Sequence, residues 1–487
     1  MTRRTAPALA LLLSACAVGP TFHTPAAPTQ TGYTETPVTR TAAPVAPIAG
    51  GAQTLTPGAP VAADWWHAFG SPALDTLVAE ALAHNSDLAA QRAALKAARE
   101  TWLASKAVLL PTVDAGANTS RSRSSQYLAP VPNTNIYEYS LQTAQVSVGY
   151  TLDLFGGGRR AIEQAHAQYD AQGFEAEAAR QTLIDNVIAG AFNVASLTAQ
   201  ITAQQRIVTL GQQSLDIARR QQRQGQTAGL DLLAQQTALA AAEAALPPLE
   251  KQLAQARDGL AYLIGRAPAD GLPAEVDLAA VTLPADLPLT LPSELVRQRP
   301  DIRAAEANLH AASAAVGIAV AARLPTITLG AQIGGQSANW AQIFSAANQM
   351  WTVGAGITQP IFEGGKLLHQ QKAAEAGLDQ ARALYRSAVL TAFQNVADTL
   401  HALALDADAL AAAEATRDAA RQTYAIAQRQ HADGEIATLA LLNAEQALRS
   451  AEQSAITAET QRLADTAALY QALGGGWSGD AAIRNSR

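Results

Sequence analysis

The chain has 487 residues, a formal net charge of −7 and 15% charged residues, well below the roughly 25% of typical soluble domains. An acidic chain presents no basic patch to phosphate groups, so this charge balance argues against nucleic acid as a partner. Alanine is abundant and aromatic residues make up only 5% of the chain, so the composition favours closely packed helices over a bulky globular core.

The first 15 residues have the layout of a secretory signal, since Arg3 and Arg4 precede an apolar stretch that is too short to span a bilayer. The stretch ends in Leu13-Ser14-Ala15-Cys16, which holds the only cysteine of the chain. Cys16 is either an incidental residue of a discarded signal or the lipidated first residue of the mature protein. A lone cysteine forms no internal disulfide, so we favour lipidation, with diacylglycerol and an N-acyl chain on Cys16 and no other cofactor.

Residues 16–63 are rich in Pro, Thr, Ala and Gly and show almost no hydrophobic periodicity. This composition predicts an extended, lipid-anchored leader without a core of its own. Ordered structure is expected to begin near Asp64-Trp65-Trp66.

Residues 64–270 predict a first structural repeat, which opens with an Ala-rich helical stretch from Pro72 to Lys106. Two segments of alternating apolar residues follow and predict strands at about 112–122 and 143–154. A helical hairpin is then expected at about 158–265.

The first helix of this hairpin, from Arg159 to Gln224, contains no proline and would extend roughly 100 Å at 1.5 Å per residue. Such a helix is several bilayer thicknesses long and must leave the membrane. Gly225 ends the helix, and the returning helix, from Asp231 to Ile264, is expected to kink at Pro247-Pro248, where two backbone donors are missing.

Residues 271–474 predict a second repeat with the same order, followed by a C-terminal tail over residues 475–487. It begins with a helical stretch from Pro292 to Ala322 and continues with strands at about 326–336 and 350–361. A hairpin follows at about 365–473, in which the long helix from Lys366 to Asp433 ends at Gly434 and the return runs from Ile436 to Leu473.

Three pairs of motifs show that the two halves are a duplication. Residues 110–117 (LPTVDAGA) recur at 324–331 (LPTITLGA), residues 146–160 recur at 353–367, and residues 219–239 match 428–448. The order is preserved and every offset is close to 210 residues. Gly156 and Gly157 in the first half, and Gly364 and Gly365 in the second, therefore belong to a repeated strand-to-helix turn.

Period-two alternation over about ten residues is typical of strands in a transmembrane barrel, although a small soluble sheet gives the same pattern. The long polar or aromatic connections over residues 121–142 and 337–349 favour the barrel. Four strands cannot close a barrel, and an edge left open in lipid would leave backbone groups unpaired. Closure must then come from further copies of the chain.

Three motifs stand in order along the chain: Cys16-Ala17-Val18-Gly19-Pro20-Thr21-Phe22, Trp65-Trp66 with Phe69 and Leu74, and Arg299-Pro300-Asp301-Ile302-Arg303-Ala304-Ala305-Glu306. They resemble the outer membrane factors of bacterial efflux pumps (TolC-type), and among them the NodT-type lipoproteins that serve resistance-nodulation-division pumps. The resemblance covers nearly the whole chain. Ala17 after the cysteine, in place of aspartate, is similar to lipoproteins that are transferred to the outer membrane.

The resemblance implies a mainly α fold with a transmembrane β-barrel, in which a homotrimer forms a twelve-stranded barrel continued by a twelve-helix tunnel across the periplasm. It implies passive conduction of drugs or other small molecules, gated at the periplasmic helix tips. The implied partners are a periplasmic membrane-fusion adaptor, an inner-membrane resistance-nodulation-division pump and outer-membrane lipid.

In TolC-like relatives, acidic residues near the hairpin tips narrow the pore. The resemblance points to Asp231 in the first tip and to Asn443 in the second, although strict repeat alignment pairs Asp231 with Ala440. The gate is therefore expected to be uneven. Asp231 could equally cap a helix, because the helix dipole favours a carboxylate near the N-terminus.

The hairpin tips carry glycines, for which the simplest explanation is chain reversal at positive φ. The resemblance adds that Gly225, Gly434 and Glu435 lie in the contact zone for the adaptor.

No constellation for an enzyme is found. The eight histidines are scattered without paired ligand spacing, and Gly156-Gly157-Gly158 lacks the GK[ST] ending of a phosphate loop. We expect no catalytic residue and no metal site. A periplasmic coiled-coil adaptor or another structural lipoprotein is the alternative, because it would also contain long hairpins, but two hairpins with duplicated strand pairs favour the channel.

Overall fold

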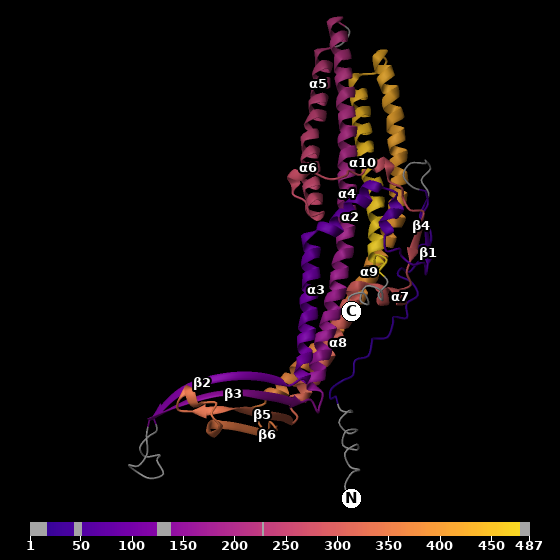
Figure 1. Cartoon of the computed structure of the whole chain (residues 1–487). Helices are drawn as coiled ribbons and strands as arrows, with labels where there is room; N and C mark the ends of the chain where they lie inside the picture. The colour runs from indigo at the N-terminus through magenta and orange to yellow at the C-terminus, as the bar shows by residue number, and fades with distance from the viewer. Residues whose placement is uncertain (1–16, 43–50, 124–137, 226–227, 478–487) are drawn as a thin grey trace. The chain divides into compact units, whose positions relative to one another are not determined.

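The computed structural model describes residues 17–42, 51–123, 138–225 and 228–477, whose elements are drawn in Figure 1. The chain divides into two compact units, and both halves of the sequence contribute to each of them. The first unit comprises Met1–Pro25, Leu95–Gln172 and Ala305–Tyr385, and the second comprises Ala26–Ala94, Gly173–Ala304 and Arg386–Arg487.

The first unit contains an antiparallel four-stranded sheet with the order β2-β3-β5-β6. Its strands are β2 (Thr112–Arg123), β3 (Glu138–Leu152), β5 (Thr326–Ser337) and β6 (Gln349–Thr358). The expected strands at about 112–122 and 326–336 each gain one residue.

Strand β3 begins five residues before the predicted start near residue 143, so residues 121–123 and 138–142 belong to strands and not to the connection that the sequence suggested. Pairing with β2 continues outward to Arg123 opposite Glu138. Strand pairing depends on backbone N–H and C=O groups alone, so it continues beyond the residues where apolar and polar side chains alternate. Glu138 adds ion pairs across the strands, 3.2 Å from Arg121 and 3.6 Å from Arg123. The middle of the connection lies outside the described residues.

Two long helices, α4 (Gly157–Arg223) and α9 (Lys366–Ala432), follow the two strand pairs. Each has 67 residues, and their ends fall within two residues of the bounds predicted from the absence of proline. Both have residues in each unit.

The two helical stretches predicted ahead of the strands are broken, which corrects the continuous helices expected there. The first becomes α2 (Pro72–His84) and α3 (Ser86–Ser105), because Asn85 accepts a hydrogen bond from the Leu88 N–H at 2.8 Å and so caps a new helix. A 3-10 turn, η2 (Lys106–Leu109), then leads to β2.

The second stretch becomes α7 (Pro292–Gln298) and α8 (Pro300–Ala321), because a proline disfavours helical geometry at the residue before it. That residue, Arg299, is buried and donates to the Ala472 carbonyl at 3.0 Å. The family motif around Arg299 thus marks a break where a guanidinium caps the end of another helix.

The returning helices are α5 (Gly229–Ala244), α6 (Leu246–Leu263) and α10 (Thr438–Ala472). The break between α5 and α6 falls at Ala245 and not at Pro247-Pro248 as predicted. The two prolines occupy the first turn of α6. Backbone N–H groups in this turn have no partner within the helix, so the two prolines remove no helical hydrogen bond.

The leader is ordered well before Asp64, contrary to the prediction. Strand β1 (Thr54–Pro57) pairs in parallel with β4 (Asp286–Leu289). The buried side chain of Gln53 donates to the Pro284 carbonyl at 3.1 Å and to Thr466 Oγ1 at 3.2 Å. A segment without hydrophobic periodicity becomes ordered here because other parts of the second unit pair its polar groups.

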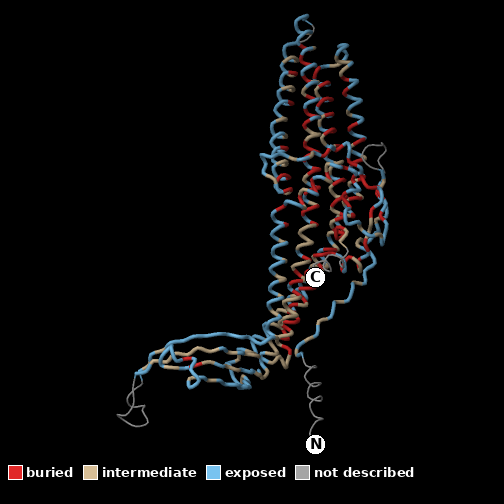
Figure 2. Tube along the Cα trace, viewed as in Figure 1, coloured by how far each residue is buried: buried red, intermediate tan, exposed pale blue. Residues whose placement is uncertain are grey.

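The core of the second unit lies along its helices, where Figure 2 shows most of the buried residues. The Trp65-Trp66 motif opens the 3-10 turn η1 (Trp65–Phe69), and Trp65 stacks on Tyr470 with ring centroids 4.9 Å apart. Tyr424 and Ala427 of α9 pack against Leu441, Ala444 and Leu448 of α10. By contrast, most residues of β2, β3, β5 and β6 are exposed or only half-buried.

Candidate functional site

The register of the sheet places the predicted apolar residues on one face. Val113 lies opposite Val148, Val148 opposite Ala331, and Ala331 opposite Val353. Directly paired residues project to the same side of a sheet, so these four form a continuous apolar row. The alternate row on the other face consists of small or polar residues: Thr112, Gly149, Gly330 and Gly354.

The apolar face carries side chains that remain exposed. Trp351, Val353 and Ile357 of β6 are 74%, 72% and 71% exposed. Large apolar side chains gathered on one exposed face indicate a surface that another apolar phase or protein covers. Strands β2 and β6 are each paired on one side only within the described residues, so both edges of the sheet are open.

The two repeated strand-to-helix turns differ in their surroundings. Gly156 has φ +79°, and a Cβ there would lie 2.7 Å from the Ala17 Cα; a Cβ on Gly157 would lie 3.0 Å from the Ala321 Cβ. In the second turn, Gly364 has φ +60° and Gly365 has φ +87°. A Cβ on Gly364 would meet no atom within 4 Å.

The first turn is crowded because the start of the leader docks on it, a feature that the sequence did not reveal. The Val18 N–H donates to the Phe155 carbonyl at 3.0 Å, and Arg160 Nε donates to the Val18 carbonyl at 3.2 Å. Gly317 of α8 lies beneath, where a Cβ would approach the Val18 carbonyl oxygen to 3.0 Å.

A second contact holds the leader through a clamp formed by Arg160, Glu163 and His310. The ring of Phe22 stacks on His310 with centroids 4.3 Å apart. His310 lies 2.8 Å from Glu163, which also accepts from Arg160 at 2.7 Å. Burial by itself raises the pKa of Glu163, but the hydrogen bonds with His310 and Arg160 outweigh it and hold the pKa below its usual range.

Cys16, the predicted lipidation site, lies outside the described residues. Its neighbour Ala17 lies against Gly156, just beyond the end of β3. The described chain after the predicted lipid site therefore starts at the strand-to-helix turn.

The hairpin tips contain the glycines singled out from the sequence. Gly225 and Gly434 are exposed and have φ +73° and +81°. After α9, the Gly434 N–H donates to the His431 carbonyl at 3.1 Å and the Glu435 N–H donates to the Gln430 carbonyl at 2.8 Å. These bonds pair the last carbonyls of the helix in the usual glycine-ended arrangement. The Glu435 side chain is exposed.

Asp231 and Asn443, the two predicted gate residues, do not occupy matching places. Asp231 is the third residue of α5, and its N–H donates to the Ala228 carbonyl at 3.1 Å. Ala440 has the same place in α10, with its N–H 2.9 Å from the Ala437 carbonyl. Asn443 lies almost one turn farther along α10 and is exposed.

Asp231 is not the N-cap residue of α5; that position is Ala228, just before the helix, and no side chain caps it. A carboxylate in the first turn still interacts favourably with the helix dipole.

No group of three or more His, Cys, Asp or Glu residues that could hold a metal ion is found in the described part of the chain. Among the described helices, α4 is long and apolar enough to cross a bilayer, yet 56% of its most apolar stretch is buried inside the protein, as in a core helix.

The duplicated strands, the exposed apolar sheet face and the glycine-ended hairpins are matched in known proteins. A sequence profile described as outer membrane efflux protein matches residues 77–266 and 291–475. The chain belongs to the outer membrane efflux protein family. This finding confirms the resemblance and excludes the adaptor alternative.

Relatives of this efflux protein match it over most of its length. It is 32% identical to the pyoverdine export outer membrane protein OpmQ of Pseudomonas putida over 86% of this chain and 89% of the relative. It is 30% identical to the probable efflux pump outer membrane protein TtgC of the same species, over 96% of this chain and 94% of the relative. The solved structure of the outer-membrane channel OprN superimposes with a TM-score of 0.84 at 28% identity, covering 95% of this chain and 100% of that chain.

The protein is thus the outer-membrane channel component of an efflux pump, and it is not an enzyme. Proteins of this family act with adaptors and inner-membrane pumps in tripartite efflux systems.

Proposed function

We propose that three copies of the chain close one twelve-stranded β-barrel in the outer membrane and continue it as a twelve-helix tunnel across the periplasm. The open edges at β2 and β6 support this assembly, because an unpaired edge within lipid would leave a row of backbone groups without partners. In a closed ring, β6 of one copy pairs with β2 of the next. The apolar row then faces lipid, and the row of small and polar residues faces the lumen.

The second strand-to-helix turn adds support. Ile361 and Phe362, which follow the edge strand β6, are 88% and 86% exposed. Phe155, the counterpart of Phe362 in the first repeat, is half-buried. Apolar side chains of this size beside an open sheet edge fit a site that the neighbouring copy covers.

The inferred anchor is lipid on Cys16, supplied as diacylglycerol and an N-acyl chain. The docking of residues 17–22 beside the end of β3 supports it, since acyl chains on the preceding residue would lie near the border of the lipid-facing sheet. Labelled palmitate should enter the wild-type protein in cells and should be absent from Cys16→Ser. Equal labelling of both would remove the lipid anchor.

The inferred periplasmic gate lies at the hairpin tips, with Asp231 in one tip and Asn443 in the other. The tips around Gly225, Gly434 and Glu435 form the adaptor contact. Leu230 and Leu439, the second residues of α5 and α10, are 77% and 68% exposed, so each tip offers an apolar side chain to a partner. The pump that completes this system belongs to the resistance-nodulation-division class.

The cargo is a small organic molecule, which the duct conducts passively. One relative is named for pyoverdine export and others for toluene or antibiotic efflux, so related ducts serve chemically different cargoes. We infer that the duct itself is permissive.

The test is restoration of drug efflux in cells that lack their own outer-membrane duct, with the cognate adaptor and pump expressed alongside. Val353→Arg places a charge on the lipid face, which costs about 2–4 kcal/mol near the bilayer midplane, and should abolish efflux. Thr352→Arg, on the other face of the same strand, is the matched control and should retain it. Equal efflux by both variants would contradict the proposed orientation of the sheet.

A further inference from the structure

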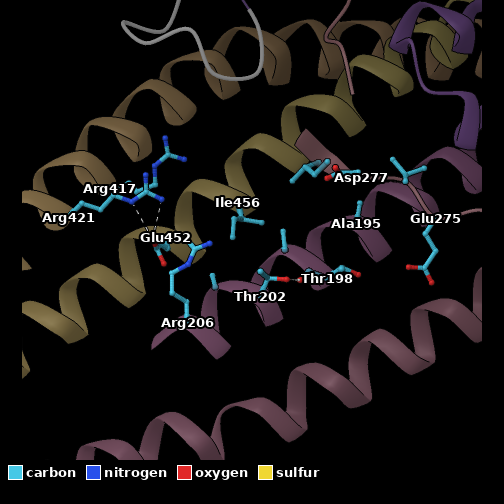
Figure 3. A pocket seen from close by; sticks show the side chains of 14 residues that line it. Ala195, Thr198, Thr202, Arg206, Glu275, Asp277, Arg417, Arg421, Glu452 and Ile456 are labelled. Atoms are coloured by element: carbon cyan, nitrogen blue, oxygen red, sulfur yellow. Dashed lines mark hydrogen bonds and ion pairs between the residues drawn. The ribbon is translucent and has the colours of Figure 1, made fainter. Parts of the chain in front are cut away.

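A cavity of about 430 Å³ lies in the second unit, lined by α4, α9, α10 and residues 275–278 (Figure 3). Three arginines, Arg206 of α4 and Arg417 and Arg421 of α9, line it together with the carboxylates of Glu275, Asp277 and Glu452.

The carboxylates of the cavity are already engaged. Glu452 accepts from Arg421 Nε at 3.3 Å and from Nη2 at 3.2 Å. Glu275 accepts from Arg257 at 2.8 and 3.0 Å. Asp277 accepts a backbone N–H at 3.1 Å at the start of a short 3-10 turn. Each of the three carboxylates therefore already has a hydrogen-bond partner, and Glu452 and Glu275 are paired with arginines.

Arg417 is paired only loosely, although it is only 9% exposed. Within the described chain, its Nε and Nη2 atoms make no hydrogen bond. The nearest carboxylate oxygens, on Asp418 and Glu414, lie 3.8 and 3.9 Å away. Burial also raises the pKa of Glu414 above its usual range. A buried guanidinium with unused donors favours an anionic ligand.

Arg206 lines the same cavity from α4; its side chain is exposed, and it forms no ion pair with another described residue. In Figure 3, Arg206 and Arg417 lie toward the same end of the cavity, near Glu452, while Glu275 and Asp277 lie toward the other end. The cavity therefore has a cationic end with unused donors and an acidic end.

The rest of the lining is mainly apolar: it consists of Ala195, Ala199, Ala203, Val276, Leu278 and Ile456, together with Thr198 and Thr202. We propose that the cavity binds one small amphipathic organic anion per protomer, with its charged head on Arg206 and Arg417 and its apolar body on this lining. A sulfonate or carboxylate head accepts hydrogen bonds from both guanidinium groups. The acidic end disfavours a second negative group, so the ligand is a monoanion.

The experiment is equilibrium dialysis of naphthalene-2-sulfonate against the full-length protein held in amphipol, so that no micelle takes up the probe. Wild type should bind one probe per protomer, and raising the salt concentration should weaken binding. Arg206→Gln should raise Kd by about tenfold. Ala199→Phe, which fills the cavity and keeps both charges, should also weaken binding.

Arg219→Gln is the matched control, because it removes the same charge from the same helix at a residue that pairs with Asp216 instead. This variant should bind like wild type. Inorganic sulfate and neutral 2-naphthol should each bind at least about tenfold more weakly than the probe, since sulfate lacks the apolar body and 2-naphthol lacks the charged head. The proposal is overturned if wild type shows no saturable binding, if Arg206→Gln equals Arg219→Gln, or if sulfate or 2-naphthol binds as tightly as the probe.

Discussion

The two strand-to-helix turns of the duplication share a glycine pattern, yet glycine is required for different reasons in each. In the first turn, Gly156 combines positive φ with direct contact to Ala17, and the leader closes over it. In the second turn, Gly364 also has positive φ, but no atom lies within 4 Å of the place its Cβ would take. The leader of the same chain docks on the first turn, whereas most residues of the second turn are exposed.

The N-termini of α4 and α9, which follow the two turns, also differ. Asp153 accepts from the Gly158 and Arg159 N–H groups at 3.0 and 2.9 Å and caps α4. The second turn has Pro360 at the corresponding place, and there an exposed side-chain ion pair joins Lys366 to Glu363 at 3.5 Å. The two turns therefore share their fold, but only the first has the docked leader and the side-chain cap.

The largest difference should come from alanine at the two glycines. Positive φ costs a non-glycine residue about 1–2 kcal/mol, and overpacking adds about 1–3 kcal/mol. Gly156→Ala should therefore destabilise the protein by about 2–5 kcal/mol, and Gly364→Ala by about 1–2 kcal/mol. Thermal unfolding followed by circular dichroism in detergent compares them. Equal losses of stability would show that the leader does not crowd the first turn.

A smaller loss is expected from the cap. Asp153→Ala should cost about 0.5–2 kcal/mol, because two N–H groups at the start of α4 lose their acceptor. Glu363→Ala, which removes the exposed ion pair of the second turn, should cost about 0–1 kcal/mol, as for other exposed pairs. The same unfolding measurement applies, and a larger effect of Glu363→Ala would reverse the comparison.

Removal of the aromatic contact should loosen the leader and leave the helices intact. Phe22→Ala loses the stack on His310, which contributes about 0.5–1.5 kcal/mol beyond the area it buries. Limited proteolysis should then cut the leader faster than in wild type, with no change in helical circular dichroism. An unchanged cleavage rate would mean that the stack does not hold the leader.

The clamp should also depend on pH. The lowered pKa of Glu163 means that its contribution is present above the unfolded value of about 4.3 and is lost as pH falls through the folded pKa. Wild type should therefore be more stable than Glu163→Gln at pH 7, and the difference should shrink on acidification to pH 3. A stability difference between wild type and Glu163→Gln that grows at low pH would contradict this role of Glu163.

The two repeats can also be compared at their hairpin tips, where the proposed gate lies. Substitutions there should have only a small effect on stability. Asp231→Ala removes a first-turn carboxylate and should cost only about 0.3–1 kcal/mol. Its single-channel conductance in the closed state should rise. Ala440→Asp, which makes the tips alike, should lower the conductance below wild type. If neither variant changes the closed state, Asp231 is not part of the gate.

The sequence predicted the long helices and the strands well, because their signals are local. The absence of proline set the ends of α4 and α9, and period-two alternation identified the strands. The breaks at Asn85 and Arg299 also had local signals, a capping asparagine and a following proline. The alanine-rich composition around both residues favours helix, which is why one continuous helix was expected across each break.

The leader contacts had no local signal. Val18 lies near Gly317, and Phe22 near His310, only because the fold brings distant segments together. The loose pairing of Arg417 and the proximity of Arg206 likewise depend on how α4 and α9 pack. Side chains that meet across such separations leave no periodic pattern in a single sequence.

Native mass spectrometry of the purified full-length protein, released from detergent, tests the closure of the sheet most directly. Because four strands with two open edges need partners, the spectrum should show one dominant species of three chains. A spectrum dominated by single chains or by dimers would contradict the twelve-stranded barrel.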